Sequence, residues 1–256
     1  ELDFKDVDNN KIASGADTLH VNTTGKITLK DATSFGGTLK LDLDKDIASN
    51  IAISGGITND TDLNDLFANA NASDKISLTL GANVTSVTLT DAAETITLAS
   101  GQQQAVTLKL GANDGAVDTV VYNLAQLQNA KPNVIQEFEK DNDKIKLAAL
   151  SLGVLTDETV SSTGATSFAT GKVYNVGEVS KAAASIEFGD LFAAQKPFKT
   201  DAATASAKGL VVAKGNDNAY AIFAVVNSND TTITNAEVKL IATVDAEVDA
   251  SNFIFA

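Results

Sequence analysis

Short clusters of aspartate and asparagine are the residues in this chain whose types and spacing could do chemistry. The clusters are DVDNN at 6–10, DLDKD at 42–46, NDTD at 59–62, GANDGAVD at 111–118, DNDK at 141–144 and GNDN at 215–218. Calcium takes about six to eight hard oxygen ligands, which carboxylates and amides crowded into one turn can supply. Asp, Asn and Gly also dominate turns for backbone reasons alone. The clusters therefore predict calcium at some turns, with turn formation without an ion as the alternative.

The chain has few of the residue types from which active sites are usually built. The chain has no cysteine and a single histidine, His20. Nucleophile–base pairs and zinc triads cannot be assembled from these parts. Asp and Glu are so frequent that any carboxylate pair has little specificity, and there is no P-loop, GxGxxG or nucleophile elbow. The sequence therefore predicts a protein that is not an enzyme.

The net charge and the types of basic residue exclude some classes of binding partner. The formal net charge is −14, and all 19 basic residues are lysines. A chain without arginine lacks the forked donor that reads phosphate and guanine, and its negative field repels nucleic acid. No apolar run approaches the roughly 18 residues of a membrane-spanning helix. We therefore expect neither nucleic-acid binding nor a membrane span, and the absence of cysteine is compatible with bacterial export.

Repeated alternating segments in the first half of the chain predict strands. They are DTLHV (17–21), GKITLKDA (25–32), GTLKLDLD (37–44), NIAISGG (50–56), DKISLTLGAN (74–83), TSVTLTDA (85–92), ETITLAS (94–100), AVTLKLGAN (105–113) and DTVVYN (118–123). Period-2 alternation with β-branched residues is the strand signature. The sequence of the intervening turns also repeats, with LGAN at 80–83 and again at 110–113. Such self-similarity favours a parallel β-solenoid or β-roll-like array, with a β-sandwich of short hairpins as the alternative.

The rest of the chain divides into further strands and a few helices. Helical spacing predicts short helices within 58–74, at 123–130 and around 180–195, the last in an Ala-, Ser-, Thr- and Lys-rich region at 154–209. Strands are expected within 133–153, 209–228, 236–244 and 252–256, with a hairpin turn at 215–217. The fold class is therefore mainly β, a solenoid-like domain at 1–132 followed by a β-rich C-terminal domain at 133–256 with one or two short helices.

Two passages resemble a known group of secreted proteins. GANDGAVDTVVYN with NVIQEFEKDNDKIKLAALSLG, together spanning 111–153, is similar to the region where RTX-type calcium β-rolls end in type I-secreted proteases, lipases and surface-layer proteins. Residues 209–256 are similar to the terminal, secretion-signal-like region of the same group. The tandem GGxGxDxUx repeat of RTX rolls is never present in full. The Thr-rich rungs resemble the β repeats of bacterial surface-layer (S-layer) proteins.

The resemblance implies export through a channel that reads the C-terminus, and folding outside the cell in calcium. At the matching positions it implies calcium-binding or turn-fixing roles for Asp118, Asp141 and Asp143, with Asn113 and Asp114 in the preceding loop. Asp217, in the cluster at 215–218, is a further metal candidate. Because the nonapeptide is degenerate, we expect isolated ions at a few turns and no full calcium ladder.

Three functions follow as hypotheses. The first is a structural subunit of a self-assembling S-layer or surface array at the bacterial cell surface, with copies of itself and a cell-surface polysaccharide as partners. The second is an adhesin or matrix protein that presents a flat Thr-rich face to a ligand. The third is the secretion tail of a hydrolase whose catalytic part lies upstream of Glu1.

Overall fold

The structure is a computed structural model of the 256-residue chain. The residues that it describes are 2–3, 17–30, 39–99, 101–102, 104–123, 131–147, 150, 152, 155–160, 167–192, 198, 206–227 and 232–255.

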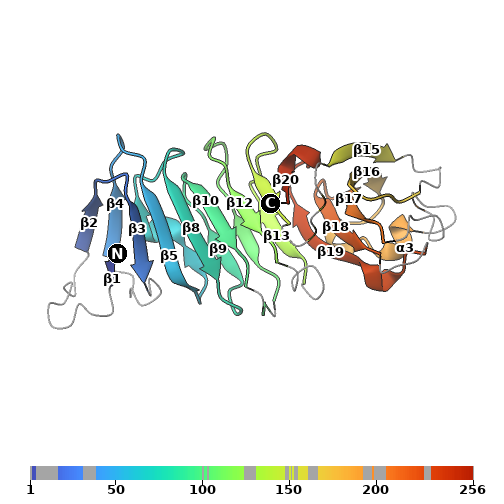
Figure 1. Ribbon diagram of the computed structural model, residues 1–256, viewed down its shortest axis with the longest axis horizontal. Coiled ribbons are helices and arrows are strands. Elements are labelled where there is room, and N and C mark those ends of the chain that lie inside the picture. The colour runs from blue at the N-terminus through green and yellow to red at the C-terminus, as the bar shows by residue number, and fades with distance from the viewer. Residues whose placement is uncertain are drawn as a thin grey trace.

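A long parallel sheet, called here the first sheet, runs through most of the molecule (Figure 1). Its strands in spatial order are β1 (Leu2–Asp3), β3 (Lys26–Lys30), β5 (Asn50–Ile57), β8 (Lys75–Leu80), β10 (Ala93–Thr97), β12 (Thr119–Val121), β14 (Lys144–Lys146) and β20 (Phe253–Ile254). Every neighbouring pair in this sheet is parallel.

Two more sheets form the opposite layer. The second sheet has the order β15 (Thr156–Val160), β16 (Lys172–Val179), β17 (Lys208–Gly215), β18 (Tyr220–Val226), β19 (Val238–Val244), β13 (Asn133–Gln136), β11 (Thr107–Lys109), β9 (Ser86–Thr88) and β6 (Thr61–Asp62). The third sheet contains β2 (Asp17–Val21), β4 (Leu39–Leu43) and β7 (Phe67–Ala68).

The chain alternates between the two layers from β8 to β14. Each strand therefore pairs with the strand two elements further along, as β8 does with β10 and β10 with β12. Inward residues stack in register, so that Ile96 lies opposite Leu78 on one side and Val120 on the other. Antiparallel hairpins of a sandwich would pair sequence neighbours instead. The prediction of a mainly β fold is confirmed, and its sheets are largely parallel.

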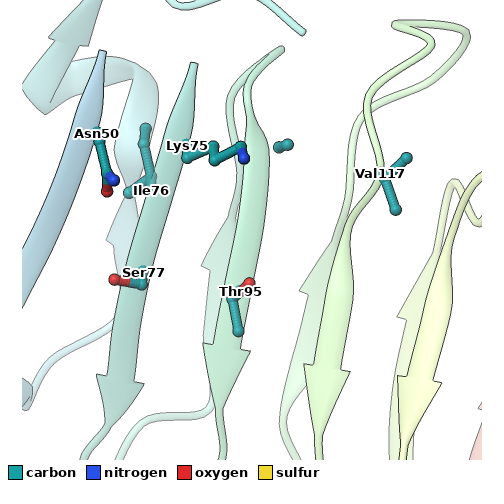
Figure 2. Close-up of a pocket in the computed structure, with 7 residues that line it drawn as sticks. Asn50, Lys75, Ile76, Ser77, Thr95 and Val117 are labelled. Atoms are coloured by element: carbon teal, nitrogen blue, oxygen red, sulfur yellow. The ribbon is translucent and has the colours of Figure 1, made fainter. Parts of the chain in front are cut away.

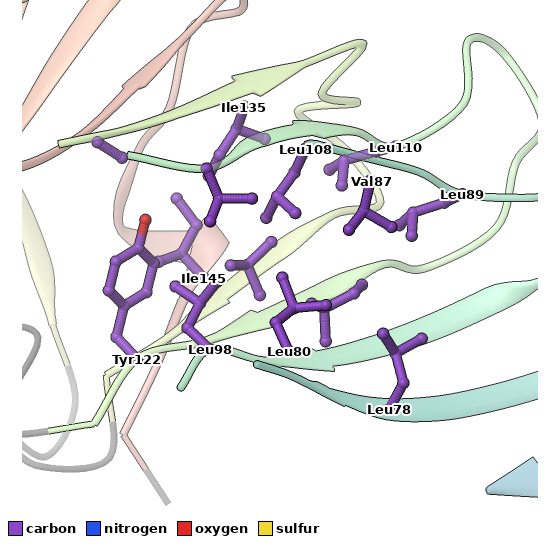
Figure 3. Packing of buried hydrophobic residues seen from close by; sticks show 14 of the residues in the cluster. Leu78, Leu80, Val87, Leu89, Leu98, Leu108, Leu110, Tyr122, Ile135 and Ile145 are labelled. Atoms are coloured by element: carbon purple, nitrogen blue, oxygen red, sulfur yellow. The ribbon is translucent and has the colours of Figure 1, made fainter. Parts of the chain in front are cut away.

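One continuous core joins the three sheets, because alternation turns every second side chain inward. In β8 the isoleucine and leucines are buried and the residues between them are not. Leu78 and Leu80 of the first sheet face Val87, Leu108 and Ile135 of the second (Figure 3). Burying one such side chain contributes about 1.5–3 kcal/mol, and the long row of them holds the layers together.

A second core lies at the C-terminal end of the second sheet. It gathers the aromatic rings of Phe168, Tyr174, Phe192 and Phe198, whose centroids lie 4.9–6.4 Å apart. The predicted hairpin is confirmed: β17 and β18 are antiparallel around the turn after Gly215. The strand at β19 is antiparallel to β18 and parallel to β13, so it connects this part to the rest of the sheet.

The sequence-based description of 154–209 omitted two strands, β15 and β16. At the start of β16 both faces are covered, since Val173 belongs to the first core and Tyr174 to the second, whereas Gly177 and Glu178 near its end are exposed. Adjacent buried residues break the apolar–polar alternation, which is why the pattern missed this strand. The predicted domain boundary at 132/133 remains a prediction; strands on its two sides pair in parallel, β11 with β13 and β12 with β14.

Helices are short. The helix predicted within 58–74 is a single turn, α1 (Leu63–Leu66), capped by the Asp62 side chain. The one predicted around 180–195 is a 3-10 turn, η3 (Ala183–Ser185), followed by α3 (Phe188–Leu191). Further 3-10 turns are η4 (Asn235–Glu237) and η5 (Ala250–Asn252). Most of the helix predicted at 123–130 lies outside the described residues. None of the helices in the described ranges is long and apolar enough to cross a membrane.

Candidate functional site: a buried acidic column

One inward column of the first sheet changes from apolar to acidic along the sheet. In β3, β5 and β8 the paired residues at this position are Ile27, Ile51 and Ile76. In β10 the partner of Ile76 is Glu94. Continuing the register one residue before Thr95–Thr119 and Thr119–Lys144 aligns Glu94 with Asp118, and Asp118 with Asp143. Because neighbouring strands lie about 4.8 Å apart, three carboxyl groups are stacked at the strand starts. We call Glu94, Asp118 and Asp143 the acidic column.

Each carboxylate of the column holds a backbone N–H group. Asp118 Oδ1 accepts from Glu94 N at 2.8 Å, and Asp143 Oδ1 accepts from Asp118 N at 3.0 Å. Asp143 Oδ2 also accepts from Glu139 N at 2.7 Å. Glu94 Oε1 accepts from Thr90 N at 3.0 Å and from the Thr90 hydroxyl. The two aspartates therefore extend the inter-strand hydrogen bonding beyond the ends of the strands.

Other polar side chains use the same device elsewhere. Asp74 Oδ1 accepts from Ser49 N at 2.7 Å, and Asn133 Oδ1 accepts from Val106 N at 2.9 Å. Asp60 accepts from the backbone N–H groups of two residues that begin the β9 region, Thr85 and Ser86. Fixing the turns between neighbouring strands is thus a structural role that these residues fill through hydrogen bonds to the backbone.

The acidic column differs from these positions because its carboxyl groups crowd one another. Glu94 is fully buried, and Asp118 and Asp143 are each only 2% exposed. Burial raises the pKa of Glu94 to about 7 and that of Asp143 to about 6. Burial also raises the pKa of Asp118, and the neighbouring carboxylates of Glu94 and Asp143 raise it further. Near neutral pH the column therefore retains a proton or requires a cation.

Among the described residues, three buried carboxylate oxygens around this column accept no hydrogen bond when the carboxyl groups are ionised: Glu94 Oε2, Asp114 Oδ2 and Glu139 Oε1. Burial raises the pKa of Asp114, and Glu139 and Asp91 act in the same direction. Leaving a buried carboxylate oxygen without a donor costs about 1–3 kcal/mol or more. Such oxygens have the donor chemistry that calcium prefers.

The turn before β12 presents Asp114. Its backbone takes positive φ at Gly111 (114°), Asn113 (58°) and Gly115 (70°), which glycine and asparagine adopt most readily. Asp114 Oδ1 accepts from Ala116 N at 2.7 Å. The other oxygen, Oδ2, lies where a Cβ of residue 111 would stand, so glycine is needed there.

The structure brings together some of the predicted metal residues. In addition to burial, the charge of Asp143 raises the pKa of Asp118, and the charge of Asp114 raises that of Asp143. Asn113 lies in the turn beside Asp114, and its side chain is exposed.

Two predicted residues lie outside this group of carboxylates. Asp141 is exposed in the turn before β14. Asp217 lies in the β17–β18 hairpin turn, where Oδ1 accepts from Ala183 N at 3.1 Å and Ala219 N at 3.4 Å. Asp217 thus connects that turn to η3.

Sequence reasoning missed Glu94 and Glu139. A signal for Glu94 was present: alternation with the buried Ile96 and Leu98 places it on the inward face of its strand. Glu139 has no such signal, because it follows β13 in a turn whose conformation includes a positive φ of 60° at Glu137.

The described part of the chain contains no group of three or more His, Cys, Asp or Glu side chains arranged to hold a metal ion. The lone histidine is exposed on β2, with Nδ1 of His20 3.2 Å from Asp42 Oδ2. The chain matches no protein-family model, and comparisons with curated proteins and with solved structures give no significant match.

Proposed function

We propose that this chain is a structural subunit of a self-assembling bacterial surface array, such as an S-layer, exported by the type I route and stabilised by calcium. The observation that supports the proposal is the continuous parallel first sheet. Its eight strands stack along the long axis of the molecule, and those from β3 to β20 contribute to one core (Figure 1). A stiff, elongated body with broad polar faces suits a load-bearing or lattice role.

The finer fold that we propose is a β-solenoid or β-roll. Lys26 pairs with Asn50 and Asn50 with Lys75, and further along Thr95 pairs with Thr119 and Thr119 with Lys144. Each of these pairings spans a similar length of chain that passes through the opposite layer, although between Asn50 and Lys75 the chain forms two strands there, β6 and β7. The step from β8 to β10, in which Lys75 pairs with Ala93, is shorter. In a solenoid, each coil buries the next, so its stability is nearly additive along the axis.

Calcium would act on the acidic column and its surroundings. Glu94, Asp114, Asp118, Glu139 and Asp143 would supply the oxygens once their side chains reorient around the ion, since the described side chains are not already arranged to hold one. The three unpartnered oxygens support the assignment. A bound cation would neutralise their mutual repulsion and remove the need for retained protons. The ion would thereby link three successive coils at the point where the inward column is no longer apolar.

Electron microscopy of concentrated protein tests the array. We expect ordered sheets or filaments in calcium, which dissolve when a chelator is added, and magnesium at the same concentration serves as the control cation. A protein that stays monomeric in calcium at every concentration contradicts the proposal.

Export is tested separately by deleting 236–256 from the full gene product in its native host. The type I proposal expects the deleted protein to stay inside the cell. Because this deletion also removes β19 and β20, a second variant places 209–256 behind an unrelated cytoplasmic protein. If that fusion is not exported and the deleted chain still is, the proposal is wrong.

An adhesin is the second candidate, because the outward face of the first sheet carries a row of hydroxyl groups. Ser77, Thr95 and Thr119 are paired neighbours in this row. Binding of the monomeric protein to a panel of immobilised glycans, lost on Thr95→Val, would favour the adhesin. Unchanged binding by the variant would count against it.

A further inference from the structure

The outward face of the first sheet is basic in an otherwise acidic protein. This face is formed by the residues that alternate with the inward ones in β3, β5, β8, β10, β12 and β14. Those whose side chains are described are Lys26, Thr28, Asn50, Ala52, Ser54, Lys75, Ser77, Thr79, Ala93, Thr95, Thr97, Thr119, Val121, Lys144 and Lys146. None of them is acidic or aromatic, although the chain has 33 acidic residues against 19 lysines. We call this surface the lysine face.

Its lysines have no acidic partner within the molecule as far as the described residues extend. Elsewhere lysines pair readily: Lys109 with Glu137 at 3.1 Å, Lys140 with Glu247 at 3.2 Å and Lys181 with Asp190 at 2.8 Å. No described carboxylate forms such a pair with a lysine of the lysine face. These ammonium groups are therefore available to a partner.

A shallow groove crosses this face over β5, β8 and β10 (Figure 2). Lys75 lines one part of it, and Ser77 and Thr95 contribute hydroxyl groups. Small Ala93 leaves the hollow open, and Val117, 46% exposed, stands at its far side. The groove thus offers a positive charge, hydrogen-bonding groups and a small apolar contact to one incoming segment.

The opposite layer carries the complementary charge near the third sheet. Asp42 lies between the buried Leu41 and Leu43 on β4 and so points away from the core, on the side opposite the lysine face. We define the acidic patch by the aspartates of this strand, of the turn after it, and of α1 with its cap at the end of β6; α1 packs on β4. The residues are Asp42, Asp44, Asp46, Asp62 and Asp65. His20, Lys40 and Lys45 offset only part of this charge.

We infer that the lysine face docks on the acidic patch of a second copy of this chain. The inference rests on the proposed array and names the contact that would build it. Because the two surfaces differ and lie on opposite layers, the contact is heterologous and need not close into a ring, so it propagates. We take the partner to be an acidic protein surface, because every other copy of this chain carries a net charge of −14 and is present wherever the protein accumulates. Complementary charge favours such a contact. The lack of aromatic rings on the face makes a sugar polymer the poorer fit.

A charge-swap experiment tests the contact. One variant carries Lys26→Glu and Lys75→Glu, whose side chains are exposed, and the other carries Asp46→Lys and Asp65→Lys, whose exposed carboxylates make no side-chain hydrogen bond among those found. We expect each variant alone to need about tenfold or more protein to associate, and an equimolar mixture to regain association. The matched control, Lys131→Glu with Lys214→Glu, changes the net charge equally away from the lysine face and should associate normally. Unchanged circular dichroism and melting temperature confirm folding.

Sedimentation velocity in calcium measures association, and electron microscopy of the same samples shows whether arrays form. Together they distinguish failure of the inference from failure of the proposed function. If wild-type protein forms arrays and the lysine variant forms them equally well, the inference is wrong and the proposed function stands. If wild-type protein associates in a salt-sensitive, charge-swappable way without ordered arrays, the inference stands and the proposed function is wrong. No self-association overturns both. Polygalacturonate serves as an acidic polysaccharide probe. If the lysine variant forms arrays normally but binds polygalacturonate more weakly than wild type, the inference is wrong and the lysine face binds a polysaccharide.

Discussion

The carboxylate of Asp118 accepts a 2.8 Å hydrogen bond from the backbone N–H of Glu94, while the side chain of Glu94 is itself fully buried beside it. The bond to the backbone favours an ionised Asp118, and the crowding of two buried carboxyl groups opposes it. Burial is the larger influence, so the pKa of both groups is raised. The first two predictions below test this relationship.

Stability without calcium should fall as pH rises. The folded state raises the pKa of Glu94 from 4.5 to about 7, so between these values it binds more protons than the unfolded chain. The contribution of this group to the free energy of unfolding therefore decreases with pH across this window and is largest below it. In chelator we expect the melting temperature to drop by roughly 5 °C from pH 5 to pH 8. Saturating calcium should flatten the slope, and a melting temperature that rises over this range would contradict the raised pKa values.

Asp118→Asn should stabilise the calcium-free protein at pH 7.5. The amide keeps an oxygen for Glu94 N–H. Burial and the neighbouring carboxylates raise the pKa of Asp118 to about 10, so at pH 7.5 the folded protein must keep a proton there that the unfolded chain releases. Asparagine needs no such proton, which should stabilise the fold by about 1–2 kcal/mol or more. We expect a higher melting temperature in chelator, a smaller pH dependence and a weaker response to calcium. The control is Asp65→Asn on exposed α1, which should change none of these. If the melting temperature of Asp118→Asn depends on pH as that of the wild type does, Asp118 does not contribute to the pH dependence of stability.

Asn133→Ala should destabilise the protein by about 2–4 kcal/mol. Asn133 is fully buried; Oδ1 accepts from Val106 N at 2.9 Å, and Nδ2 donates to the Tyr122 hydroxyl at 3.2 Å. Alanine leaves the Val106 N–H group buried without this acceptor. Urea denaturation gives the change in the free energy of unfolding. Gln136→Ala, exposed at the end of the same strand, should stay within about 0.5 kcal/mol of wild type, and equal effects for the two would refute the assigned role.

Gly209→Ala should also cost stability, by about 1–3 kcal/mol. A Cβ at this position of β17 would stand 2.9 Å from Lys172 O and 2.9 Å from Phe168 Cζ, so the pairing of β16 with β17 or the aromatic core must shift. Gly101→Ala is the matched control, since a Cβ there meets nothing within 4 Å. Thermal melts of the pair measure the difference, and indistinguishable melting temperatures would show that β17 accommodates the methyl group.

The sequence by itself determined the local structure of much of the chain. Alternation located strands such as β8 and β10, helical spacing after Asp62 located α1, and the Gly–Asn–Asp text located the β17–β18 turn. These features depend on residues close together in the chain, which is why patterns reveal them. The acidic turns before β12 and β14 were likewise visible as Asp–Asn clusters.

Only the tertiary structure decided which of these pieces meet. Parallel strands pair across intervening elements, so their register depends on side chains stacking between coils and cannot be read locally. That register brings Glu94 into line with Asp118 and leaves Asp217 in a distant hairpin turn. It also places β16 between two cores, which removes its alternation. Two of the predicted acidic clusters, at 111–118 and 141–144, thus each contribute one residue, Asp118 and Asp143, to a buried column that Glu94 completes and whose charge must be balanced.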